Sequence, residues 1–143
     1  QQYKAKQIGV EKTEALKDNL LEIAPYVAIE THSVIISENN AEELLEEADI
    51  ICEAFDDAEC KAMLVNLVLE RMPIKYLVTA SGMAGFGSAN AIQTRRVSKQ
   101  FYICGDGTSD VKSEGSLVAS RVMLCAAHQA HTVLRILTEQ FET

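Results

Sequence analysis

A short apolar run followed at once by acidic residues is the feature around which the chain is organised. Residues 50–52 (Ile-Ile-Cys) have the character of a buried strand in a parallel sheet. Glu53, Asp56 and Asp57 come next, and a helical pattern begins at Ala58. Ligands of open α/β sheets bind beyond the carboxyl ends of the strands, so these carboxylates stand where a phosphate-bound Mg²⁺ is expected. The alternative, which the spacing alone favours, is that Asp56 and Asp57 only cap the helix.

The first half of the chain alternates between helical and strand patterns. We expect a helix over residues 12–23, a strand over 27–36, a short acidic helix over 40–47, a strand over 49–54, a helix over 58–71 and a strand over 76–80. Pro25 ends the first of these helices, and Asn40 stands at the first position of a capping box with Glu43. Such alternation is typical of a doubly wound sheet with right-handed crossovers.

The second half of the chain departs from this alternation. Residues 89–95 and 100–104 resemble two strands without a helix between them, so we expect them to be antiparallel. A glycine-rich loop over 105–115 and a long apolar helix over 116–139 follow. The predicted fold is a single α/β domain, residues 1–143, with a Rossmann-like mixed sheet. Its parallel strands come first, its antiparallel strands lie near the C-terminal end, and helices flank the sheet.

The glycine cluster at Gly82, Gly85 and Gly87 resembles a dinucleotide fingerprint only when it is read backwards. A phosphate-cradling loop needs its glycines directly before a helix, so that backbone N–H groups face the anion. No helical pattern follows this cluster. We therefore interpret these glycines as residues that permit a positive φ at a sharp bend or close chain packing.

The composition argues against several kinds of partner. The formal net charge is −8 and no face is rich in Lys or Arg, which argues against a nucleic-acid groove. No apolar run approaches the roughly 20 residues that a membrane helix needs. No signal peptide opens the sequence, so we expect a cytoplasmic protein with reduced thiols.

The cysteines and histidines form no metal-binding pattern. The four cysteines stand far apart, at positions 52, 60, 104 and 125. None of them are spaced Cys-x-x-Cys, so no structural zinc is expected. Cys52 and Cys125 lie within apolar runs, and we expect both to be buried. His128 and His131 are spaced i, i+3, but no carboxylate or cysteine stands close to them in sequence. A packing or surface role is expected for both.

Four stretches, in order along the chain, resemble a known family. They are Gln1-Gln2-Tyr3 with residues 8–15, residues 49–57, Ala80-Ser81-Gly82 with Gly85, and residues 126–130. Together they resemble the ThiF/MoeB/HesA family, the ubiquitin-activating-type adenylyltransferases that act on small sulfur-carrier proteins. The resemblance covers essentially the whole chain and is closest to the ThiF-like branch.

The resemblance implies a set of roles for particular residues. Lys12 would contact the ATP phosphates and stabilise charge that develops during adenylyl transfer, and Asp56 would hold Mg²⁺ on those phosphates. Gln1 would lie at the edge of the nucleotide site, and Asp57 would lie beside Asp56 in it. A ubiquitin-like carrier protein would pass its C-terminal Gly-Gly tail beneath a crossover loop, here residues 105–115. Members of the family are commonly homodimers.

The chain also departs from the family pattern. The family's glycine-rich loop, ribose-binding acidic residue and catalytic arginine all precede the position of Gln1. The chain therefore resembles the middle of a longer polypeptide, an adenylation domain without its N-terminal part. We expect the 143 residues alone to be inactive and to bind ATP poorly. Micromolar affinity in a titration with Mg-ATP would contradict this. Asp57 replaces a more common Asn and Glu53 a more common Asp, both mild changes.

The cysteine positions differ from the family pattern as well. Cys104 stands near the second cysteine of the family's first zinc pair, but Phe101 occupies the partner position and the second pair is missing. No cysteine occurs between Gly105 and Leu117, where some relatives carry a reactive thiol. The resemblance therefore implies a zinc-free branch and gives no support for a covalent sulfur-relay step.

Two other classes of function remain open. One is a nicotinamide-dependent oxidoreductase built on half of a Rossmann fold, which the two late antiparallel strands fit less well. The other is a non-catalytic module that dimerises through its final helix and a sheet edge.

Overall fold

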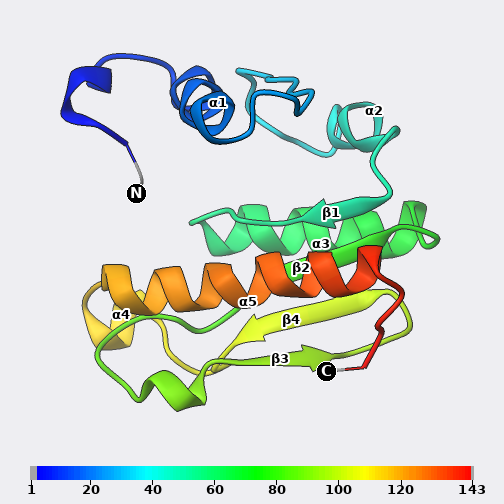
Figure 1. Ribbon diagram of the computed structural model, residues 1–143. Helices are drawn as coiled ribbons and strands as arrows, with labels where there is room; N and C mark the ends of the chain where they lie inside the picture. The colour runs from blue at the N-terminus through cyan, green and yellow to red at the C-terminus, as the bar shows by residue number, and fades with distance from the viewer. Residues whose placement is uncertain (1–2, 143) are drawn as a thin grey trace. The chain divides into compact units, whose positions relative to one another are not determined.

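The computed structural model describes residues 3–142 of the chain, so Gln1 lies outside the described residues. The chain divides into two units, Gln1–Ile36 and Ser37–Thr143 (Figure 1). No helix within the described residues combines the length and the apolar character that crossing a bilayer requires.

The first unit contains a 3₁₀ turn, η1 (Ala5–Gln7), and the helix α1 (Lys12–Ile23). The bounds of α1 are those predicted, and its C-cap is Ala24, because the following Pro25 disfavours a helical conformation in the residue before it. Ala15 is the buried residue of α1. The side-chain amide of Gln7 donates to the backbone carbonyl of Ala15 at 3.0 Å and so holds η1 against the helix.

The strand predicted over residues 27–36 is wrong: this segment has irregular structure. A strand depends on a neighbouring strand for its hydrogen bonds, and no strand within the described residues pairs with this segment. Three of its apolar side chains are accordingly exposed, those of Val27, Val34 and Ile35, the last to 91%. Side chains hold the segment to α1 instead. Ser33 donates to Glu11 at 3.0 Å, and Thr31 donates to Glu14.

The second unit is built on a four-stranded mixed sheet. Its strands are β1 (Ile50–Cys52), β2 (Tyr76–Ala80), β3 (Gln93–Arg96) and β4 (Phe101–Gly105). The sheet order is β1-β2-β4-β3. β1 and β4 both run parallel to β2, with Leu77 opposite Ile51 on one side and Phe101 on the other, while β3 pairs antiparallel with β4. The predicted mixed sheet is therefore confirmed.

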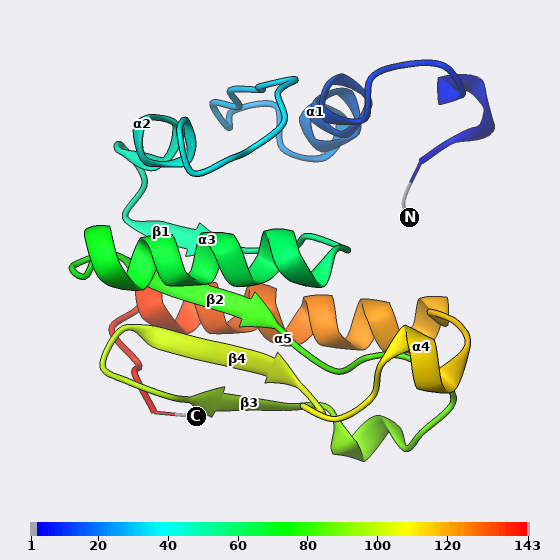
Figure 2. The same ribbon diagram turned by 180° about the vertical axis from the view of Figure 1, so that it is seen from behind.

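Two long helices cover opposite faces of this sheet (Figures 1 and 2). These are α3 (Ala58–Arg71) and α5 (Ala119–Leu137). The bounds of α3 agree with the prediction, and α5 is slightly shorter than predicted. The shorter elements are α2 (Ala41–Leu45), the 3₁₀ turn η2 (Ala89–Ala91) and α4 (Val111–Glu114). α4 lies within the segment expected to be a loop. The core lies between the sheet and its helices, where Val78, Tyr102 and Cys125 are fully buried.

Two local predictions are wrong. Asn40 does precede α2, but its side chain makes no capping bond to the helix. Its Oδ1 accepts from the backbone N–H of Ser37 at 2.8 Å instead, because that donor lies just before the turn. Cys52 is exposed rather than buried. Cys52 lies opposite Val78 and on the same face of the sheet, but β1 is an edge strand, so neighbouring strands do not flank Cys52 on both sides.

Candidate functional site

Three loops follow the carboxyl ends of the parallel strands β1, β2 and β4. Because parallel strands end at the same edge of a sheet, residues 53–57, 81–88 and 105–110 lie along one edge of the second unit (Figure 2). This is the edge at which the sequence predicts a phosphate site.

Glu53, directly after β1, is the most heavily bonded acidic residue in the first loop. It is 1% exposed. The ammonium of Lys61, from α3, donates to both of its carboxylate oxygens, at 2.8 and 2.6 Å. The hydroxyl of Thr79 also donates to this carboxylate, as does the backbone N–H of Phe55 at 2.6 Å. The carboxylate of Glu53 is thus held by groups from α3, from β2 and from its own loop.

The backbone of Glu53 is held as firmly as its side chain. Its N–H donates to the carbonyl of Val78 at 2.9 Å, which extends the β1–β2 pairing by one residue. Its carbonyl accepts from the side chain of Gln129, on α5, at 2.8 Å. Gln129 belongs to the last stretch of the family resemblance, and sequence analysis assigned it no role. The available signal was a glutamine four residues after Cys125, on the predicted apolar face of the last helix.

Asp57 and Asp56 have different environments. Asp57 is the N-cap of α3, and its Oδ1 accepts from the backbone N–H of Cys60 at 2.8 Å. This hydrogen bond lowers the pKa of Asp57. The capping interpretation is therefore confirmed for Asp57. Asp56 is exposed, and no hydrogen bond or ion pair within the described residues engages its carboxylate.

The donor set at Asp56 fits a nucleotide-bound Mg²⁺. Within residues 3–142 no group of three or more His, Cys, Asp or Glu side chains could enclose a metal ion. Mg²⁺ on a nucleotide does not need such a cage, because one or two carboxylates, water and the phosphates complete its octahedron. An exposed carboxylate at the carboxyl end of a parallel strand satisfies that requirement, so Asp56 remains the candidate ligand.

The predicted partner of Asp56 across the site belongs to the other unit. Lys12 is the first residue of α1, and its side chain is exposed. The convergence of Lys12 and Asp56 on one triphosphate stays a prediction, as does the part assigned to Gln1.

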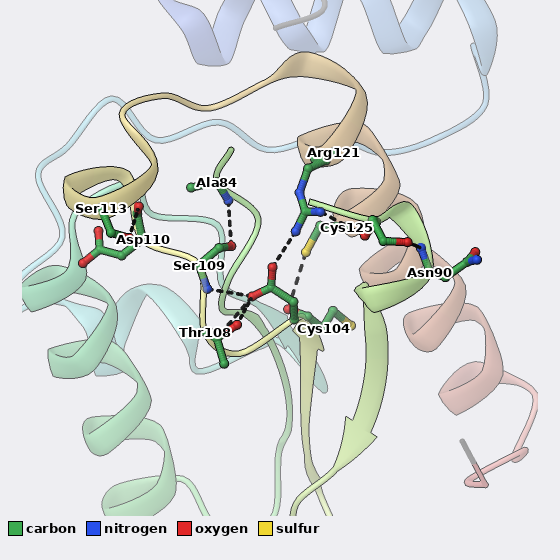
Figure 3. A network of polar contacts seen from close by, with 11 residues as sticks. Ala84, Asn90, Cys104, Thr108, Ser109, Asp110, Ser113, Arg121 and Cys125 are labelled. Atoms are coloured by element: carbon green, nitrogen blue, oxygen red, sulfur yellow. Dashed lines mark hydrogen bonds and ion pairs between the residues drawn. The ribbon is translucent and has the colours of Figure 1, made fainter. Parts of the chain in front are cut away.

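A second buried ion pair, Asp106–Arg121, joins the other two loops to α5 (Figure 3). Arg121 is 5% exposed, and its guanidinium donates to the carboxylate of Asp106 at 2.5 Å and to the carbonyl of Ser88 at 2.9 Å. The other carboxylate oxygen of Asp106 accepts from the backbone N–H groups of Thr108 and Ser109, both at 2.8 Å. Sequence analysis missed both residues; an aspartate between two glycines and an arginine in an apolar helix were the signals.

The electrostatics of Asp106 follow from these contacts. Its burial by itself raises the pKa, but the backbone N–H groups of Ser109 and Thr108 outweigh that effect and lower the pKa to about 2. Asp106 is therefore an anion at any physiological pH, and Arg121 remains paired. This pair fixes the position of the two loops and is no candidate for proton transfer.

The glycines allow these two loops to approach each other closely. Gly82 has φ +79°, and a Cβ at this position would stand 2.1 Å from the carboxylate of Asp106. Gly105 has φ +135°, and a Cβ there would stand 1.9 Å from the carbonyl oxygen of Ser81. The interpretation of the glycine cluster as a bend with close chain packing is thus confirmed at Gly82.

Both ends of the predicted crossover loop are attached to the loop after β2. At its start, the hydroxyl of Ser109 accepts from the backbone N–H of Ala84 at 3.0 Å (Figure 3). At its end, the carbonyl of Ser116 accepts from the N–H of Gly85 at 2.9 Å. A hollow of about 380 Å³ lies beside this junction, lined by Ala84, Gly87, Ala91, Asp106, Thr108, Ser109, Glu114 and Arg121.

A larger groove of the second unit lies elsewhere. It measures about 780 Å³ and runs between α5 and the strands β3 and β4. His128 lines it, and its Nδ1 shares a hydrogen bond of 3.0 Å with the hydroxyl of Thr94. His128 is half-buried with its ring held by Thr94, which agrees with the predicted packing or surface role. This groove contains no carboxylate that follows a parallel strand, so its size does not make it the nucleotide site.

Comparisons with known proteins agree with this fold. The family model described as ThiF family matches residues 1–143. No curated protein sequence matches the chain. Among solved structures, E. coli tRNA N6-threonylcarbamoyladenosine dehydratase, TcdA, is similar. Its AMP complex has a TM-score of 0.72 at 17% identity, covering 92% of this chain and 66% of that chain.

Two further TcdA structures give the same result. The ATP complex has a TM-score of 0.72 at 17% identity, covering 92% of this chain and 65% of that chain. A third structure has a TM-score of 0.73 at 14% identity, covering 95% and 67%. The chain thus spans about two thirds of the length of these relatives, and at this identity the likeness shows the fold alone.

Proposed function

Because the chain belongs to the ThiF family, we propose that it is part of an ATP-dependent adenylyltransferase for a ubiquitin-like sulfur-carrier protein. The family has an adenylyltransferase-type fold, and TcdA, which shares that fold, has been crystallised with AMP and with ATP. The observation that carries the proposal is the family match over residues 1–143, joined to an exposed Asp56 at the carboxyl end of a parallel strand. This is where the family places its acidic magnesium ligand.

The proposed reaction is the activation of a carboxylate. The C-terminal glycine carboxylate of the carrier attacks the α-phosphate of ATP, an oxygen–phosphorus bond forms, and pyrophosphate leaves with the electrons of the broken bond. Lys12 contacts the phosphates and offsets the charge that develops on them. Asp56 would hold Mg²⁺ on the phosphates, and the ion would supply positive charge that offsets part of the charge of the triphosphate. Positioning and preorganised positive charge supply most of the rate enhancement, because adenylyl transfer needs little covalent help from the protein.

The charge of the chain favours a protein carrier over an RNA substrate. TcdA is named for a modified nucleoside of tRNA. The present chain has a formal net charge of −8. RNA binding depends on neutralising several phosphates with Lys and Arg, and an acidic surface repels the RNA backbone. A small protein with a flexible Gly-Gly tail needs only a narrow channel to the α-phosphate, which the loops at this sheet edge would provide.

The test uses the full-length protein that contains this chain, with ATP and a carrier that ends in Gly-Gly. We expect exchange of radiolabelled pyrophosphate into ATP that depends on the carrier and is lost in Asp56→Ala. Removal of one carboxylate that holds Mg²⁺ should lower the exchange rate by at least ~100-fold. Glu59→Gln, an exposed acidic residue in the first turn of α3, is the matched control and should keep the exchange.

Other outcomes identify other functions. Hydrolysis of ATP that requires tRNA and not the carrier would show that the substrate is RNA and not a carrier protein. Turnover linked to NADH would favour an oxidoreductase. If none of the three assays detects activity and the protein sediments as a stable dimer, a non-catalytic interaction module is the remaining function. We also propose that the active form is a homodimer, and a monomer that retains full exchange activity would contradict this.

A further inference from the structure

We propose, resting on the function proposed above, that Lys61 is a positioning residue that holds the magnesium-binding loop in place through Glu53. Residues 53–57, here called the Asp56 loop, connect β1 to α3. Lys61 contacts neither Asp56 nor the nucleotide in this proposal. It fixes the carboxylate of Glu53, and that carboxylate fixes the backbone immediately before Asp56.

The contacts on both sides of Asp56 carry the inference. On one side, the backbone N–H of Phe55 donates to the carboxylate of Glu53 at 2.6 Å. On the other side, the carboxylate of Asp57 accepts from Cys60 and caps α3. Both neighbours of Asp56, Phe55 and Asp57, are therefore held by side chain to backbone hydrogen bonds. Its carboxylate remains exposed at the tip, where an incoming ligand can reach it.

The position of Glu53 depends on Lys61. The side chain of Glu53 is 0% exposed and that of Lys61 is 23% exposed. Bidentate contact from one ammonium, at 2.8 and 2.6 Å, together with the Thr79 hydroxyl, saturates the carboxylate. A buried ion pair of this kind contributes little net stability, since desolvation offsets most of the attraction. The ion pair does restrict the geometry of the Asp56 loop, which contains the candidate metal ligand.

Coulomb's law and positioning predict opposite effects of removing Lys61. A positive charge near the magnesium site repels Mg²⁺, so its loss should strengthen metal binding if charge alone mattered. Positioning predicts weaker binding instead, because the loop would no longer hold Asp56 in place. The double variant Glu53→Gln/Lys61→Met leaves the local net charge unchanged and avoids an unpaired buried charge, so it isolates the positional effect.

Two measurements on the same proteins test the proposal. The first is the Mg²⁺ concentration for half-maximal carrier-dependent pyrophosphate exchange, in the full-length protein. We expect the double variant to need about 10- to 100-fold more Mg²⁺, the usual cost of losing an outer-shell partner of a metal ligand. Lys61→Arg, which keeps the charge and the donors, should stay within about 3-fold of wild type. Lys99→Met removes an exposed lysine from the turn before β4 and should leave the required Mg²⁺ concentration unchanged.

The second measurement needs no activity. Hydrogen exchange at the amide of Phe55 should be at least ~10-fold faster in the double variant than in wild type, because its acceptor is no longer anchored. The amides of β2 should keep their protection, which would show that the fold is intact. Lys61→Arg and Lys99→Met should leave the exchange of Phe55 at the wild-type rate.

The outcomes separate this inference from the proposed function. An active double variant with wild-type Mg²⁺ dependence, or with unchanged exchange at Phe55, would overturn the role of Lys61 and leave the proposed function standing. Tighter Mg²⁺ binding by the double variant would overturn it too, because loss of positioning predicts weaker binding. A wild-type protein without carrier-dependent exchange would refute the proposed function, and this inference with it.

Discussion

At the scale of single residues, the pair formed by Asp106 and Arg121 makes a prediction about pH. Asp106 has a pKa of about 2 in the folded protein, below its ordinary value of 3.8. A carboxyl whose pKa falls on folding stabilises the protein above its unfolded pKa, and that stabilisation is lost as the pH drops through the folded pKa. Asp106 should therefore contribute about 2 kcal/mol at pH 7, and this should disappear between about pH 4 and pH 2.

Urea unfolding of wild type and Asp106→Asn across this pH range measures the effect. At pH 7 the variant should lose about 3 kcal/mol of unfolding free energy, since Arg121 would stay buried without its charged partner. The difference from wild type should shrink below pH 4, where wild-type Asp106 is itself becoming protonated. Asp56→Asn, at an exposed position, should stay within about 0.5 kcal/mol of wild type. A difference that is constant from pH 7 to pH 2.5 would contradict the assignment.

At the scale of elements, the start of α3 separates stability from function. Asp57 caps the helix through Cys60, whereas Asp56 makes no such contact. Asp57→Ala should lower the unfolding free energy by about 1 kcal/mol, the usual cost of losing an N-cap. Asp57→Asn should lower the unfolding free energy much less, because Asn is an equally favoured N-cap residue.

The same denaturation experiment, with Asp56→Ala as its control, checks this division. Asp56→Ala should leave the unfolding free energy within about 0.5 kcal/mol of wild type, although the proposed function requires that it abolish exchange activity. Equal stability of Asp57→Ala and wild type would show that the hydrogen bond to Cys60 does not support the helix.

At the scale of the whole molecule, the two units should differ in local stability. A helix is stable in a protein mainly through the packing of an apolar face. α1 buries only Ala15, while its Leu20 and Ile23 are 41% and 80% exposed. α5 instead buries a continuous stripe against the sheet, formed by Arg121, Cys125, Gln129, Thr132 and Ile136.

Native-state hydrogen exchange measures this difference in local stability directly. We expect the amides of α1 to exchange through local opening that costs at most about 2 kcal/mol, and those of β2, β4 and α5 to exchange only on global unfolding. Protection of α1 equal to that of α5 would show that the first unit is stabilised by contacts beyond those within residues 3–36.

Much of the fold could be predicted because its signals are local. The bounds of α1 and α3 follow from helical periodicity, from Pro25 and from the capping residue Asp57. The antiparallel pair β3 and β4 follows from two strand-like segments without a helix between them. The strand predicted over residues 27–36 is wrong for the converse reason, since a strand forms only where a neighbour completes its hydrogen bonds.

The sequence by itself determined the order and type of most elements, the family, and the place of Asp56 after β1, because each depends on residues close together in the chain. Only the tertiary structure decided how that place is supported. Gln129 reaches Glu53 across 76 positions, and Arg121 reaches Ser88 across 33. No periodicity or spacing predicts such pairs, because their energy depends on burial and on donors and acceptors that meet only after the sheet and its helices have packed.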